Sequence, residues 1–164
     1  MKTKQKEQIA KFRDVYERQF GRVYKLALLL LGNVTDAEDA VQIVFARFWE
    51  KKPDFYDINH ENAWFITVVR NQCKDMQRDY FRKNRTNIGN ALEVQVEFFY
   101  PEDNDLWQAM QELPHKYRVI LYLYYYEGYS VRELSGIFHR KESTLQTQLA
   151  DGRKKLRKIM EINK

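Results

Sequence analysis

The chain has 164 residues, of which 44% are hydrophobic and 31% charged, a composition that excludes a disordered or membrane-embedded protein. Its 28 lysines and arginines exceed its 23 aspartates and glutamates, and the net charge of +5 suits a polyanionic partner. A single cysteine excludes an internal disulfide, and no apolar run follows the lysine-rich start, so we expect a cytoplasmic protein without a signal peptide.

The charges divide the chain into three parts. Residues 1–85 have a net charge of +5, residues 86–112 have −6 without any basic residue, and residues 113–164 have +6. The stretch from 86 to 104 also loses helical periodicity and holds asparagine, glycine and proline, which are typical of linkers. We therefore expect two small domains joined by a flexible acidic linker, although one domain with a surface loop fits the same pattern.

The first basic part predicts three helices. Apolar residues recur at three- and four-residue steps, as on one helical face, over residues 12–31, 37–49 and 64–81. Gly32 ends the first helix, and Thr35 with Glu38 has the spacing of a capping box for the second. Pro53 stops the second helix, and Trp49 is expected to lie in the core.

Two groups of side chains in this part suit nucleic acid. The polar face of the third helix suits a DNA strand and carries Arg70, Asn71, Lys74 and Arg78. The loop over residues 53–62 holds aromatic rings and an amide, which suit stacking and hydrogen bonding to bases, in Phe55, Tyr56, Asn59 and His60. The structural alternatives are a solvated helix face and loop aromatics that pack into the core.

The second basic part predicts a helix-turn-helix. A helix opens at Pro114, and Ser130 with Glu133 forms a capping box for a short helix that ends at Phe138. A longer helix begins near Glu142. In a helix-turn-helix this second helix lies in the DNA major groove, so we expect the C-terminal domain to bind DNA. Since every predicted element is a helix, we expect an all-α fold.

The longer helix carries side chains that can read bases. Gln146 and Gln148 can pair with adenine edges, and the Thr147 methyl group suits thymine. The following basic residues would bind phosphates and make binding salt-dependent. A solvated helix face is again the alternative.

The order of these parts resembles an extracytoplasmic-function (ECF) sigma factor, the small two-domain group of the sigma-70 family of bacterial RNA polymerase initiation subunits. The run Asp36–Trp49 is similar to the family's region that clamps the polymerase β′ coiled coil. Asn62–Arg78 resembles its −10 promoter helix, and Leu113–Leu134 resembles the opening of its −35-binding domain. The resemblance implies a region 2 domain over residues 6–86, an acidic linker over 87–104 and a region 4 domain over 105–164.

The resemblance also implies partners and site residues. The partners are core RNA polymerase, through its β′ coiled coil and β flap, promoter DNA and an anti-sigma factor; no enzymatic activity, cofactor, metal or membrane insertion is implied. The polymerase contacts are Asp36, Asp39, Gln42, Phe45 and Trp49. The −10 contacts are the loop and third-helix residues named above. The −35 contacts are Arg140, Lys141, Ser143, Thr144, Gln146, Thr147, Gln148, Arg153, Lys154 and Arg157.

Four positions depart from the family pattern. Ile43 stands where an acidic residue is usual, which removes one polar contact to polymerase. His139 and Lys141 replace a usual turn glycine and a capping serine or asparagine, and Asp151 replaces a common basic residue. We therefore expect altered −35 specificity and weaker phosphate attraction at the start of the reading helix.

Two other functions compete with this interpretation. A freestanding helix-turn-helix regulator with an N-terminal helical sensor domain would bind DNA without core polymerase. A nucleic-acid-processing enzyme would need a metal or nucleophile site, but the three histidines are isolated and no glycine-rich phosphate loop occurs. Chelator-sensitive nuclease activity would favour the enzyme.

Overall fold

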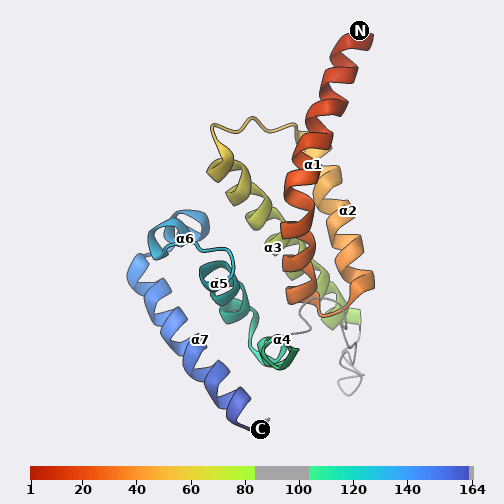
Figure 1. Cartoon of the computed structure of the whole chain (residues 1–164). Helices are drawn as coiled ribbons and strands as arrows, with labels where there is room; N and C mark the ends of the chain where they lie inside the picture. Colours follow the sequence, from red (N-terminus) through yellow and green to blue (C-terminus); the bar gives the residue numbers. More distant parts are fainter. Residues whose placement is uncertain (84–103, 163–164) are drawn as a thin grey trace. The chain divides into compact units, whose positions relative to one another are not determined.

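The computed structural model describes residues 1–83 and 104–162, which form helices and no strand (Figure 1). These residues divide into two compact units, an N-terminal unit of three helices and a C-terminal unit of four. The helices are α1 (Lys2–Leu31), α2 (Val34–Lys51), α3 (Ile58–Lys83), α4 (Asn104–Glu112), α5 (His115–Tyr125), α6 (Val131–Phe138) and α7 (Glu142–Ile162). The expected all-α fold is confirmed. The predicted acidic linker lies outside the described residues except for Asn104, which begins α4.

In the N-terminal unit, α1 packs against both α2 and α3, and these two also pack against each other. Phe45 of α2 is 4% exposed and lies between the rings of Tyr16 and Phe65, at centroid distances of 4.7 and 5.4 Å. The first turns of α1 project beyond the other two helices, and every side chain from 1 to 11 is exposed (Figure 1). The part of α1 that contributes to the core is therefore its later turns, from Val15 to Leu31.

Helix α2 begins one residue before the predicted capping box. Asn33 has extended backbone angles and is the N-cap: its Oδ1 accepts a hydrogen bond from the Asp36 amide at 2.8 Å. Thr35 therefore lies inside α2, and the predicted Thr35–Glu38 capping box is wrong. Asparagine is at least as favourable as threonine at a helix N-cap. Gly32, with φ 78°, ends α1 as predicted, and α2 ends at Lys51 before Pro53.

In the C-terminal unit, α7 packs against α4, α5 and α6. The predicted capping box of α6 is confirmed: the Ser130 hydroxyl accepts from the Glu133 amide at 3.1 Å, and Glu133 Oε1 accepts from the Ser130 amide at 3.2 Å. Helix α6 ends at Phe138 and α7 begins at Glu142, which confirms the helix-turn-helix.

Arg118 ties α5 to the end of α4. Its guanidinium donates to the backbone carbonyls of Leu113 and Gln111, each at 2.6 Å. Burial lowers the pKa of Arg118 to about 10, which leaves it charged at neutral pH. The charge therefore satisfies carbonyl groups that the short α4 leaves without helical partners.

Candidate nucleic-acid interface

Three side chains of α7 are predicted to read bases, and they differ in exposure and in their hydrogen bonds within the protein. Gln146 is exposed. Gln148 is half-buried, and its Oε1 accepts a hydrogen bond from Arg140 at 3.3 Å. The Thr147 hydroxyl donates to the carbonyl of Ser143 at 3.0 Å, which leaves its methyl group to contact a base. Gln146 is thus the side chain best placed to read a base edge.

Basic side chains continue along the same exposed face. At 100° per residue, Lys154 and Arg157 project on the same side of α7 as Gln146, and all three are exposed. Arg153 is exposed and donates to the Tyr125 hydroxyl at 3.1 Å. Asp151 is exposed about one turn before Lys154, so one negative charge lies beside that cation. The remaining predicted contacts, Arg140, Lys141, Ser143 and Thr144, are exposed at the turn and the first turn of α7.

The α2–α3 loop is shorter than predicted, because α3 begins at Ile58. Asp57 caps this helix: its Oδ1 accepts from the His60 amide at 2.8 Å. Asn59 and His60 therefore lie in the first turn of α3, and their predicted place in the loop is wrong. Asp57 sets the start of α3, and the sequence has no capping-box spacing at this position that predicts it.

Tyr56 and His60 form an exposed aromatic stack. Their ring centroids are 5.2 Å apart with an interplanar angle of 24°, and the Tyr56 side chain is fully open to solvent, at 95% exposure. His60 Nδ1 accepts from the Tyr56 amide at 3.2 Å, which fixes the two residues in register. Phe55 is instead half-buried against Phe48 and Trp64, and its ring also meets the His60 ring edge-on at 5.4 Å, so it supports the stack from the side of the core.

The polar face of α3 continues from this stack. Helical spacing places Asn71, Lys74 and Arg78 on the same side of α3 as His60, and all three are exposed. Arg70, at the edge of this face, is half-buried, and Arg78 also pairs with Asp75 at 3.3 Å. The face thus runs from an aromatic stack to a row of cations, which suits single-stranded nucleic acid.

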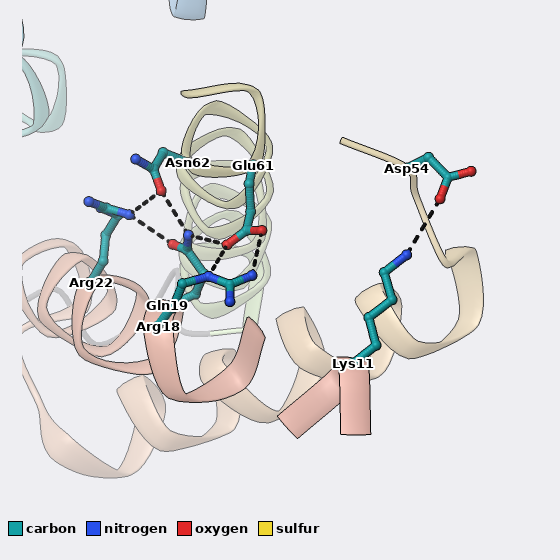
Figure 2. Close-up of polar contacts among 7 residues, drawn as sticks. All are labelled: Lys11, Arg18, Gln19, Arg22, Asp54, Glu61 and Asn62. Carbon is teal, nitrogen blue, oxygen red and sulfur yellow. Dashed lines mark hydrogen bonds and ion pairs between the residues drawn. The ribbon is translucent and has the colours of Figure 1, made fainter. Parts of the chain in front are cut away.

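A partly buried polar network joins α1 to the start of α3 (Figure 2). Arg18 of α1 makes a two-pronged contact with the Glu61 carboxylate, at 2.9 and 3.2 Å. Gln19 Nε2 donates to Glu61 at 2.8 Å and to Asn62 at 2.7 Å, and Arg22 donates to the Asn62 side-chain oxygen at 2.6 Å. Glu61 and Gln19 are 5% and 1% exposed. Sequence reasoning missed this network because it joins residues about 40 positions apart.

The electrostatics of Glu61 follow from these partners. Burial alone raises the pKa of a carboxyl group, but hydrogen bonds from Arg18 and Gln19, with the charges of Arg18 and Arg22, outweigh it. The pKa of Glu61 therefore lies below its ordinary value. The group is a carboxylate at neutral pH and holds a negative charge inside the N-terminal unit.

The predicted polymerase contacts lie mainly on the outer face of α2. Asp39 and Gln42 are exposed, Ile43 is 37% exposed, and Asp36 is half-buried because it accepts from the N-cap Asn33. Trp49 is 41% exposed, not in the core as expected.

Phe45 does not belong to this surface. Its side chain is inside the N-terminal unit, as described above, so the expected direct contact is corrected. The periodicity that puts Ala37 and Val44 in the core also turns position 45 inward.

Comparison with known proteins settles the family. The family model of sigma-70 region 2 matches residues 15–86, and that of sigma-70 region 4 matches residues 103–156, so the two cover most of the chain in the family's order. The chain belongs to the sigma-70 family. The ECF RNA polymerase sigma factor SigW of Bacillus subtilis is 29% identical, over 90% of this chain and 87% of SigW. The ECF RNA polymerase sigma factor SigE of Mycolicibacterium smegmatis is 29% identical, over 88% of this chain and 59% of SigE.

These relatives place this sigma-70 protein in the ECF group. The fold also matches the sigma factor RpoE, in a crystal structure with the anti-sigma factor NepR from Bartonella quintana. The TM-score is 0.76 at 20% identity, covering 94% of this chain and 99% of RpoE. The region 2 match contains the Tyr56–His60 stack and the α3 face, and the region 4 match contains α4 and most of α7.

Among the helices of residues 1–83 and 104–162, none is long and apolar enough to cross a membrane. Over the same residues, no group of three histidine, cysteine or acidic side chains gathers closely enough to hold a metal ion.

Proposed function

We propose that this ECF sigma factor binds core RNA polymerase and directs it to promoters through a −10 contact on α3 and a −35 contact on α7. The single observation that carries this proposal is one side of α3, where the exposed Tyr56–His60 stack lies at the start of the helix and exposed Asn71, Lys74 and Arg78 follow about three turns later. An aromatic platform beside cations serves an unstacked base followed by its strand. A duplex-binding regulator has no need of such a platform.

At the −10 element, Tyr56 is the stacking surface and His60 supports it from below. Asn59, in the same first turn of α3, is exposed and can reach a base edge through its amide. Lys74 and Arg78 bind phosphates of the melted strand, with Asn71 and Arg70 beside them. Phe55 acts by holding the loop against the core and by its edge-on ring contact with His60.

At the −35 element, Gln146 reads a base edge and the Thr147 methyl group contacts a neighbouring base. Gln148 contributes through its hydrogen bond to Arg140, which aims the guanidinium along the groove. The phosphate contacts are Arg140, Lys141, Arg153, Lys154 and Arg157, with Ser143 and Thr144 at the N-terminal turn of α7.

Polymerase binding is assigned to the outer face of α2, with Asp39, Gln42 and Trp49 as direct contacts to the β′ coiled coil. Asp36 acts through the cap of α2, and the C-terminal unit contacts the β flap. The chain works in the cytoplasm, where the polymerase acts. An anti-sigma factor is a further partner, supported by the RpoE–NepR complex of similar fold.

Copurification with core RNA polymerase tests the proposal. The full chain is expected to coelute with core polymerase, and Asp39→Arg is expected to weaken this binding more than tenfold by reversing a charge at the contact. Glu7→Arg makes the same charge change at an exposed site on the projecting part of α1, and it should bind normally. A wild-type chain that binds duplex DNA but not polymerase would instead favour the freestanding regulator.

A further inference from the structure

The network around Glu61 is a precise mechanical link between α1 and the first turn of α3. Two helices contribute to it: Arg18, Gln19 and Arg22 extend from α1, and Glu61 and Asn62 extend from α3 (Figure 2). Both carboxylate oxygens of Glu61 accept hydrogen bonds, and the Gln19 amide bridges Glu61 to Asn62. The start of α3 therefore has one defined rotation and height relative to α1.

The same turn of α3 holds the exposed aromatic stack. His60 immediately precedes Glu61, and Asp57, which caps the helix through the His60 amide, lies one turn earlier. Tyr56 in turn hydrogen-bonds to His60 Nδ1. Because a helical turn moves as one piece, fixing Glu61 from beneath also fixes the Tyr56–His60 stack above it.

The chemistry of the Arg18–Glu61 ion pair suits a positioning role better than a role in stability. Glu61 is buried but the Arg18 side chain is 48% exposed, so the cost of desolvating the carboxylate and the screening of Arg18 by water together offset much of the attraction. A two-pronged guanidinium–carboxylate contact does, however, impose a single geometry. The nearby Lys11–Asp54 pair is different: its side chains are 63% and 97% exposed and meet at one point, 3.5 Å apart (Figure 2).

We propose that the Arg18–Glu61 pair is a positioning device that holds the Tyr56–His60 stack in place to capture one unstacked base of the −10 strand. This inference rests on the proposed −10 contact and deepens it. Arg18 and Glu61 touch no DNA. They act through the first turn of α3.

The test measures how much one base contributes to binding. Holoenzyme assembled from the full chain is bound to single-stranded −10 DNA, from a promoter that the enzyme selects from a random library, with each base in turn removed to leave an abasic site. For wild type, removing the captured base is expected to weaken binding about tenfold, the value of one base stacked on an aromatic ring. In Glu61→Gln this factor is expected to fall toward one, while binding to core polymerase is kept.

Two variants make the result specific. Asp54→Asn makes the same acid-to-amide change at the exposed pair and should keep the tenfold factor. Arg18→Lys keeps the charge but loses the fork, so it should also reduce the factor, and it decides the question if Glu61→Gln no longer binds polymerase. A tenfold factor retained in Glu61→Gln overturns the positioning role. If Glu61→Gln does not bind polymerase, a tenfold factor retained in Arg18→Lys overturns it instead. A wild-type holoenzyme with no base dependence contradicts the proposed −10 contact itself.

Discussion

Gly152 of α7 lies directly against Leu121 of α5: a methyl group at position 152 would stand 3.2 Å from the Leu121 Cδ1 atom and 3.3 Å from Tyr117. Gly152 is buried in the middle of a 21-residue helix, where glycine lowers helix stability. The close approach of α7 to α5 explains why it is there. The spacing of the DNA-reading helix from the rest of the C-terminal unit therefore depends on the missing side chain.

Gly152→Val is expected to destabilise the C-terminal unit by about 2 kcal/mol, because the added methyl groups push α7 away from Leu121. The measurement is chemical denaturation of the full chain. Gly136→Ala in α6 is the matched control: nothing lies within 4 Å of its Cβ position, so it should stabilise by about 1 kcal/mol through helix propensity. Equal unfolding curves for wild type and Gly152→Val would show that α5 and α7 are not closely packed.

His139→Gly is expected to stabilise the same unit by about 1 kcal/mol. His139 is the C-cap of α6 with φ 53°, in the left-handed region that glycine adopts without steric cost. Arg140→Gly is the control, because position 140 does not have a positive φ and gains nothing from glycine. A lower melting temperature for His139→Gly than for wild type would contradict this explanation of the turn.

Local patterns predicted most of the fold. The periodicities, Gly32, Pro53 and the Ser130–Glu133 box act within a few residues, and the helices that they mark formed, although α1 begins ten residues and α3 six residues before the expected apolar stretch. Helix α4 was missed, because its nine residues continue the acidic composition of the linker. Asn33, and not Thr35, caps α2. Both residue types are favoured at helix N-caps, so their identity alone does not choose between the two positions.

The site was predicted less completely, for a physical reason. Exposure depends on which neighbours meet a side chain: Phe45 and Phe55 look alike in sequence to exposed aromatics, but partners from other helices bury them wholly or in part. The Glu61 network depends on contacts between residues 18–22 and 61–62, which no local spacing reveals. The left-handed turn at His139 was visible only as the absence of a usual glycine.

Gln146→Ala is expected to change −35 preference at one base pair, with about a tenfold loss on the preferred sequence and little change on others. The reason is that Gln146 is the exposed amide on the outer face of α7. Binding to a panel of −35 duplexes measures this, and Gln108→Ala on α4 is the control of the same residue type. An equal loss on every sequence would remove the base-reading role.

The stability of the N-terminal unit is expected to carry a pH dependence from Glu61. Its pKa is lower folded than its ordinary 4.5, so its contribution is fully present above about pH 4.5 and is lost as the pH falls through the folded pKa. Glu61→Gln should be about 1–2 kcal/mol less stable at pH 7, a value reduced by the exposure of Arg18, and the gap should close toward pH 3. Melting temperatures of both proteins from pH 7 to 3 provide the check. Parallel curves would mean that Glu61 is not paired.

Transcription in vitro tests the sigma role most directly. Core RNA polymerase is mixed with a random promoter library, with and without the purified full chain, and the transcripts are sequenced. The account predicts that the chain adds transcripts from templates that share a −35 and a −10 element, and that core polymerase alone gives none of them. Identical transcripts with and without the chain would contradict it.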